Sequence, residues 1–155
     1  MRSIEIRAYA DREHKAGVAS VLAALGWEQR HVDGQLAAVA EFSGSADGSV
    51  LVAVEESVVA GYVSVGFEAW NRLGQIHGLA VLPEARRRGI AKALVEAAVQ
   101  RLRSQGARGV RVDTPVDNLT GRLFYQSAGF TEDHILTRYY ADDLDGVTYV
   151  RFFDM

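Results

Sequence analysis

A strand, a turn of three arginines and a helix follow one another without interruption between residues 79 and 105. Residues 79–82 are apolar, as in a buried strand. The turn ends in Arg86, Arg87, Arg88 and Gly89, and apolar side chains at helical spacing begin directly after it. A helix N-terminus offers unpaired N–H groups and a positive dipole end to an anion. The layout therefore predicts a phosphate-binding turn and limits the fold to one in which a strand feeds such a helix.

Composition narrows the class of protein. The chain has 155 residues, 48% hydrophobic and 24% charged, and we expect one domain spanning residues 1–155. A net charge of −3 argues against a nucleic-acid binder. The lack of cysteine excludes disulfides, thiolate metal sites and a cysteine nucleophile. No apolar run approaches the ~18 residues that span a bilayer, so we expect no membrane association and a cytoplasmic location.

Hydrophobic periodicity predicts an alternation of strands and helices. Helices are expected at about residues 11–25, capped by Asp11, and at 33–42, 89–105 and 118–127. Strands are expected at about residues 4–7, 50–54, 58–67, 75–82, 110–112, 130–140 and 147–153. Glycines 106 and 129 should end two of the helices. Gly78 within a strand suggests a bulge or a close ligand approach. The order of elements indicates a mixed α/β or α+β sheet.

The arginine turn also carries a family resemblance. Residues 86–91, Arg-Arg-Arg-Gly-Ile-Ala, resemble the Arg/Gln-x-x-Gly-x-Gly/Ala signature of the GCN5-related N-acetyltransferases (GNAT). Asn118, Tyr125 and the pair Gly129-Phe130 fall in register with further residues of that family. The resemblance covers roughly residues 50–153. It implies the GNAT fold, a mixed central sheet of about six to seven strands flanked by about four helices.

The resemblance further implies acetyl-CoA as the donor of an acetyl group to an amine, with no metal. Backbone groups of the strand at 79–81 would bind the pantetheine arm as if adding a strand, and the turn would surround the pyrophosphate. The amide of Val81 is the candidate donor to the thioester carbonyl. The expected cofactor-binding residues are Leu79, Ala80, Val81, Arg86, Arg87, Arg88, Gly89, Ile90, Ala91, Lys92, Asn118 and Tyr125.

Acetyl transfer to an amine needs a neutral amine, a polarised carbonyl and a proton for the departing thiolate. With no cysteine in the chain, direct attack in a ternary complex is favoured over a cysteinyl acyl-enzyme. Tyr125 is the candidate general acid, because a phenol of pKa about 10 stays protonated at neutral pH. The alternative is an ordinary half-buried aromatic on a helix face.

Two residues compete for the general base. His77 lies two residues before Leu79, so strand alternation predicts that both side chains point to the same side. Asp113 lies five residues before Asn118, where some family members place a carboxylate. The alternatives are a strand histidine with no catalytic part and a cap or turn aspartate. Glu68 is a third candidate, and either leading residue could act through water.

The acceptor stays open at this level. The segment Arg138-Tyr139-Tyr140 before an acidic turn resembles the peptide-lining hairpin of N-terminal protein acetyltransferases, whereas Asp142, Asp143 and Asp145 would suit a small cationic amine. We therefore predict an N-acetyltransferase acting on a small-molecule amine or a peptide N-terminus. The alternatives are a catalytically silent acetyl-CoA-binding sensor and an interaction module. Whether the chain forms a homodimer is left open.

Overall fold

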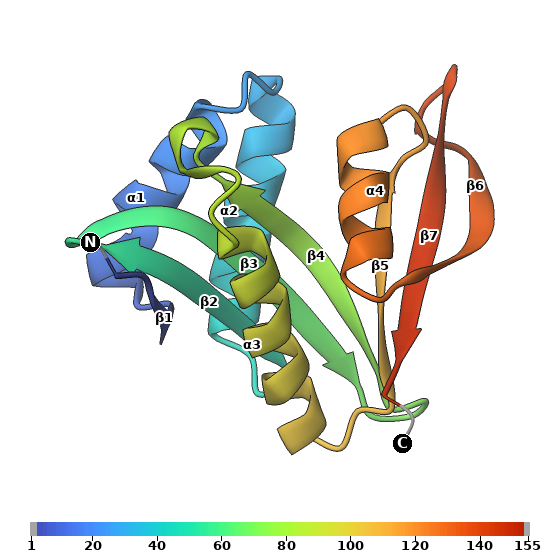
Figure 1. Ribbon diagram of the computed structural model, residues 1–155, viewed down its shortest axis with the longest axis horizontal. Coiled ribbons are helices and arrows are strands. Elements are labelled where there is room, and N and C mark those ends of the chain that lie inside the picture. The colour runs from blue at the N-terminus through green and yellow to red at the C-terminus, as the bar shows by residue number, and fades with distance from the viewer. Residues whose placement is uncertain (1–2, 154–155) are drawn as a thin grey trace.

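The computed structural model describes residues 3–153 and folds around one seven-stranded sheet (Figure 1). Its order is β1-β2-β3-β4-β5-β7-β6. Only β4 and β5 are parallel neighbours among the pairs of the described residues, and the other pairs are antiparallel. The strands are β1 Glu5–Ala8, β2 Gly48–Glu55, β3 Val58–Glu68, β4 Leu73–Val81, β5 Gly109–Pro115, β6 Thr131–Ala141 and β7 Leu144–Phe152. The mixed sheet predicted from the sequence is confirmed.

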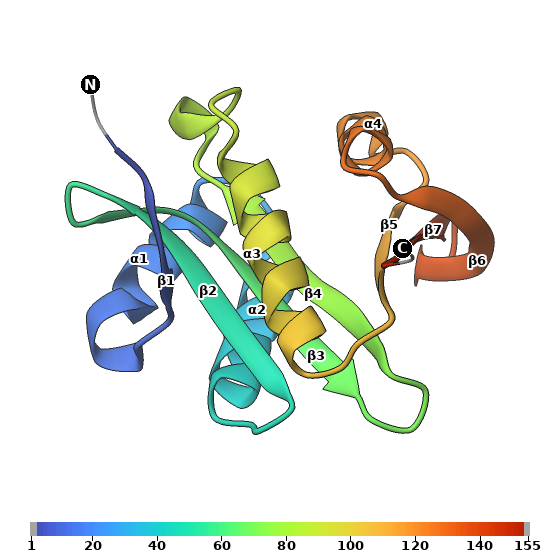
Figure 2. The same ribbon diagram turned by 60° about the horizontal axis from the view of Figure 1, so that its bottom comes forward.

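The helices cover both faces of the sheet (Figures 1 and 2). Helices α1 and α2 lie on one face, where Val18, Val21 and Leu22 pack against Tyr62 of β3. Helices α3 and α4 lie on the other face, and their buried side chains join the larger core cluster. The bounds are α1 Asp11–Ala23, α2 Gln29–Ser43, α3 Ile90–Ser104 and α4 Leu119–Ser127, with a short 3-10 turn at Pro83–Ala85.

Two predicted helix ends are confirmed and two predicted starts are wrong. Gly106 and Gly129 adopt positive φ angles of 92° and 91° after α3 and α4. Ala10, not Asp11, precedes the first turn of α1, and its N–H donates to His14 Nδ1 at 2.9 Å. Helix α2 begins at Gln29 rather than near residue 33, because Val32 of its first turn is buried against the sheet.

The two hairpins differ in how well the sequence predicted them. The hairpin between β2 and β3 is confirmed, and Glu56 and Ser57 both have positive φ, as a tight two-residue turn requires. The second hairpin is tighter than predicted. Ala141 pairs with Leu144, so the acidic turn is only Asp142 and Asp143. In the part of the chain that the structure describes, no helix is long and apolar enough to cross a membrane.

Candidate active site

Strands β4 and β5 separate partway along their length (Figure 1). Their parallel pairing runs from Leu73 opposite Gly109 to Ile76 opposite Val112 and ends there. Each strand continues beyond that point, β4 to Val81 and β5 to Pro115. The last part of β4 therefore has a sheet partner on one edge, β3, and has lost it on the other.

The backbone of β4 points donors toward this open edge. On the β3 side, β4 stays paired up to Val81, and the N–H of Leu82 donates to the carbonyl of Ala60 at 2.8 Å. N–H groups point alternately to the two edges of a strand in an antiparallel ladder. The N–H groups of Leu79 and Val81 therefore face the edge that β5 has left.

A β-bulge interrupts β4 at His77. Ser64 of β3 lies opposite Gly78, whereas the next residue, Val65, lies opposite Ile76. His77 is the extra residue between them, which is the arrangement of a bulge. The bulge predicted at Gly78 is thus confirmed, with His77, the preceding residue, as the extra residue.

The bulge overturns the predicted direction of His77. Leu79 packs into the core on the α3 face, whereas the His77 ring stacks on Phe42 of α2 with centroids 4.4 Å apart. A Cβ at Gly78 would meet atoms on the α2 side as well. The extra residue breaks the alternation, so the expectation that His77 and Leu79 share one side is wrong.

Carboxylates surround the His77 ring from three elements. Burial lowers the pKa of His77, and the charges of Asp113, Glu41 and Glu68 act in the opposite direction. These carboxylates belong to β5, α2 and β3 respectively. The site therefore combines an imidazole that is easily kept neutral with negative charge that attracts a cation.

Asp113 lies where β5 begins to diverge, one residue beyond the last pair with β4. Its carboxylate accepts a hydrogen bond from Thr148 Oγ1 of β7 at 2.6 Å. Its charge also acts on Tyr140, whose pKa is raised mainly by burial and further by Asp113. Asp113 is therefore the group shared by His77 and the tyrosine of the β6–β7 hairpin.

Tyr125 is a buried residue of α4 with 8% of its surface exposed. Its ring contacts Phe124, Phe130 and Tyr149 edge-on or tilted, with centroids 5.3, 5.5 and 6.1 Å away. Burial raises its pKa, so the phenol stays protonated at neutral pH. None of the hydrogen bonds found within residues 3–153 uses its hydroxyl group. Its side chain belongs to the same core cluster as Leu79 and Val81.

Asn118 has a structural task in this arrangement. It caps α4, since its Oδ1 accepts from the N–H of Gly121 at 3.1 Å. Its Nδ2 donates to Thr114 Oγ1 at 2.9 Å, which ties the helix to β5. These contacts account for an asparagine here independently of any ligand, and its role toward CoA stays a prediction.

The arginine turn presents backbone N–H groups. Arg87 and Gly89 both adopt positive φ angles, 63° and 78°. The first helical bond of α3 runs from the N–H of Ala93 to the carbonyl of Gly89. No side chain of the described residues caps this helix start. The N–H groups of Ile90 and its successors in the first turn are therefore directed out of the helix. The geometry is that of an anion site.

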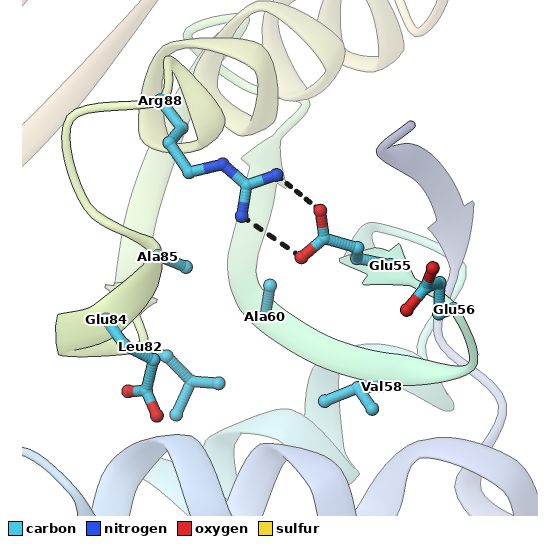
Figure 3. A pocket seen from close by; sticks show the side chains of 8 residues that line it. All are labelled: Glu55, Glu56, Val58, Ala60, Leu82, Glu84, Ala85 and Arg88. Carbon is cyan, nitrogen blue, oxygen red and sulfur yellow. Dashed lines mark hydrogen bonds and ion pairs between the residues drawn. The ribbon is translucent and has the colours of Figure 1, made fainter. Parts of the chain in front are cut away.

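The three arginines of the turn are not equivalent. Arg88 forms a two-pronged ion pair with the buried Glu55 at the end of β2, with Nη1 donating to Oε1 at 3.0 Å (Figure 3). Among the described residues, no ion pair involves Arg86 or Arg87. Three consecutive arginines repel one another unless an anion compensates their charge, and for Arg88 Glu55 supplies that anion within the fold.

Arg88 also borders a pocket that the sequence did not reveal. It measures about 340 Å³ and lies between the β2–β3 hairpin and the 3-10 turn (Figure 3). Its lining comes from Glu55, Glu56, Val58, Ala60, Leu82, Glu84, Ala85 and Arg88. Nothing near residues 55–60 in the sequence signals it, since the hairpin and the turn meet only through the fold.

The predicted residues thus lie along the second half of β4 and on the elements beside it. His77 and Asp113 lie at the point of strand divergence, and Asp113 also acts on Tyr140 of the β6–β7 hairpin. At its end, β4 leads through Val81 into the arginine turn. Two features depart from the expected arrangement: Arg88 is held by Glu55, and His77 faces α2 rather than the side of Leu79.

Two curated proteins are similar to this chain in sequence. One is N-alpha-acetyltransferase 30 of Schizosaccharomyces pombe, 34% identical over 79 residues, which are 51% of this chain and 53% of that protein. The other is an N-alpha-acetyltransferase of Saccharolobus solfataricus, 30% identical over 112 residues, 64% of this chain and 66% of that protein. The chain thus spans about half of the first relative and just under two thirds of the second.

Solved structures share the whole fold. A GNAT-family protein from Desulfovibrio desulfuricans has a TM-score of 0.89 at 22% identity, covering 97% of this chain and 99% of that one. An aminoglycoside 6'-N-acetyltransferase complexed with coenzyme A has a TM-score of 0.83 at 15% identity, covering 97% and 98%. At these identities the likeness concerns the fold. The sequence profile of the Acetyltransferase (GNAT) family matches residues 19–130, more than half of the chain. Fold and sequence agree, and the chain belongs to the GNAT family of acetyltransferases.

Proposed function

We propose that this protein transfers the acetyl group of acetyl-CoA directly to the primary amine of an acceptor within a ternary complex. The observation that carries the proposal is the open edge of β4, which runs without interruption into the uncapped start of α3. A long, polar thioester donor can pair with the first and place its phosphates at the second.

The donor contacts follow from this path. The N–H groups of Leu79 and Val81 would bind the pantetheine arm as an added strand, and that of Val81 would polarise the thioester carbonyl. The first-turn N–H groups of α3, with Arg86 and Arg87, would hold the pyrophosphate. Arg88 would act mainly through its ion pair with Glu55, by holding the turn in shape.

The chemistry requires two proton movements. The amine nitrogen attacks the thioester carbon, the C–S bond breaks, and the amine gives up a proton. His77 is our proposed acceptor of that proton, since burial keeps its imidazole neutral. Tyr125 would supply a proton to the departing thiolate, because its buried phenol is fully protonated. Asp113 remains the rival base and would reach the amine through water.

We propose a peptide N-terminus as the acceptor. Both curated relatives are named N-alpha-acetyltransferases. Tyr139 and Tyr140 form an edge-on pair with ring centroids 5.1 Å apart on the β6–β7 hairpin. Tyr140 is half-buried beside Asp113, so this pair can line one side of a peptide that presents its α-amine to His77.

A small cationic amine is the second candidate. The carboxylates of Glu41, Glu68 and Asp113 around His77 favour a cation with several charges over a neutral peptide. This candidate predicts an acceptor KM that rises with ionic strength, because screening weakens such attraction over about 8 Å. Replacing Glu41 with Gln would then raise the KM, whereas the exposed Glu13 of α1 offers a matched control.

The test is thiol release from acetyl-CoA with matched acceptors. Peptides with a free N-terminus are compared with the same peptides blocked at the N-terminus, and with polyamines and aminoglycosides. Mass spectrometry then locates the acetyl group. Turnover confined to free N-termini supports the peptide proposal, and turnover confined to the small amines overturns it. Acetyl-CoA that raises the melting temperature without turnover on any acceptor identifies the catalytically silent sensor.

A further inference from the structure

Three polar side-chain atoms converge behind the β4 bulge. An added Cβ at Gly78 would lie 2.2 Å from Gln35 Oε1, 2.8 Å from the Tyr62 hydroxyl and 3.1 Å from Ser64 Oγ. Tyr62 and Ser64 are both fully buried, at 0% exposure. The cluster therefore lies between α2 and the sheet, directly beneath His77 and Gly78.

Gln35 connects this cluster to the bulge. The Tyr62 hydroxyl donates to Gln35 Oε1 at 2.7 Å, and Gln35 Nε2 donates to the backbone carbonyl of His77 at 3.2 Å. A carbonyl can only accept, so the orientation of the amide is set by chemistry. The extra residue of a bulge loses its place in the ladder, and Gln35 supplies a donor to the carbonyl of that residue.

Packing alone does not explain these residues. The surrounding interface between α1, α2 and the sheet consists mainly of valines and leucines, which bury well without hydrogen bonds. Burying polar groups there costs free energy unless they are paired, and Ser64 Oγ has no partner among the described residues. A buried polar cluster is expected where its hydrogen bonds hold a particular backbone geometry, here that of the β4 bulge.

We infer that Gln35 is a positioning residue for acetyl transfer, which fixes the β4 bulge and so aims both the His77 ring and the backbone donors of residues 79–81. Tyr62 holds the amide of Gln35, and Gly78 leaves room for it. This inference rests on the proposed function, because it concerns the same reaction centre. It differs from that proposal in placing the determinant on α2, away from the reacting atoms.

The main test replaces Gln35 with Met, which keeps the length and removes both hydrogen bonds. The matched control is Gln29→Met on the same helix, whose amide donates to the exposed Asp33 instead. We expect the first variant to lower kcat about 10-fold or more, because small displacements of reacting groups reduce rates steeply. The KM for acetyl-CoA should change less, and the control should behave as the wild type.

Two further variants separate positioning from folding. Tyr62→Phe removes only the support of the amide and should lower kcat less than Gln35→Met. Gly78→Ala would push the Gln35 amide away without changing it and should resemble Gln35→Met. A fall in melting temperature with kcat unchanged in the Gln35 variant would mean that the cluster is merely structural, and would overturn the inference.

A readout without turnover completes the test. The chain has four histidines, so the imidazole signal of His77 can be assigned in an NMR spectrum by its loss in His77→Gln. We expect this signal to move in Gln35→Met and to stay in Gln29→Met; an unmoved signal contradicts the inference. A wild type inactive toward every acceptor would overturn the proposed function instead, while the His77 signal still decides the positioning.

Discussion

Arg88 and Glu55 join the arginine turn to the end of β2 through a two-pronged ion pair, with Nη1 donating to Oε1 at 3.0 Å. Residues 33 positions apart in the chain are thereby held together. The ion pair holds the turn against β2 within the fold. One of the three exposed arginines is thus compensated by Glu55, whereas Arg86 and Arg87 form no ion pair among the described residues.

Arg87 and Arg88 should differ in what their loss affects, ligand binding for the first and stability of the turn for the second. Arg87→Ala should weaken acetyl-CoA binding by about 10-fold, the value of one charge-assisted hydrogen bond. Arg88→Ala should instead lower the melting temperature of the ligand-free protein and weaken binding less. Calorimetric titration and thermal unfolding measure the two effects. The reverse ranking in binding would show that Arg88 leaves Glu55 for the ligand.

Tyr125→Phe should lower kcat by about 10² to 10⁴, the range for removing a general acid, with acetyl-CoA affinity nearly unchanged. Tyr149→Phe provides the matched control in the same aromatic cluster. Its hydroxyl accepts from Arg122 Nε at 3.1 Å, so its loss should affect stability rather than turnover. Equal kcat values in the two variants would remove Tyr125 from the chemistry.

The rate should depend on pH through His77. Burial lowers its pKa below the ordinary value of about 6.5, and an imidazole accepts a proton only when neutral. After correction for deprotonation of the acceptor amine, we therefore expect kcat/KM to stay level at neutral pH and to fall only as pH drops through that lowered pKa. The facing carboxylates of Asp113, Glu41 and Glu68 limit the shift.

Variants identify the group responsible for that profile. His77→Gln should lower kcat/KM and remove its acid limb, whereas the exposed His134 should tolerate the same change without effect. A limb that persists in His77→Gln and disappears in Asp113→Asn would assign the base to Asp113.

The stability of the fold should also decrease as the pH is lowered. Because the folded state binds the His77 proton less readily, the melting temperature should decline on acidification.

Gly89→Ala should destabilise the turn by about 1 to 2 kcal/mol, the cost of a left-handed backbone for a residue with a Cβ. Among residues 3–153, no atom lies within 4 Å of the added Cβ, so backbone strain is the expected effect. Acetyl-CoA binding should weaken as the first-turn N–H groups shift. Gly34→Ala on α2, where helical geometry suits alanine, should stabilise the protein. A neutral Gly89→Ala would contradict the expected strain.

Local patterns predicted the elements well because each pattern reports interactions within a short segment. Gly106 and Gly129 end their helices as expected, since only a residue without a Cβ adopts those φ angles at little cost. The alternating valines of β2 and β3 predicted their hairpin for a similar reason. The start of α2 was missed because burial of Val32 extends the helix beyond its propensity.

The sequence predicted which residues belong to the candidate site, but not how the fold arranges them. Tyr125, His77 and the arginine turn were all identified from the sequence. The alternation of side chains along a strand, however, predicted the wrong side of β4 for His77. No sequence pattern pointed to Gln35 and Tyr62. A glutamine on a helix and a tyrosine on a strand are ordinary until the bulge brings the carbonyl of His77 within reach of the Gln35 amide.

The sequence by itself determined the order of strands and helices, the glycines at their ends and the turn that offers N–H groups and arginines to an anion. Those features depend on neighbours a few residues apart. Only the tertiary structure decided that Glu55 neutralises Arg88, that β5 departs from β4 after Ile76, and that His77 faces α2. Each of these depends on contacts between segments distant in the chain, which no local pattern encodes.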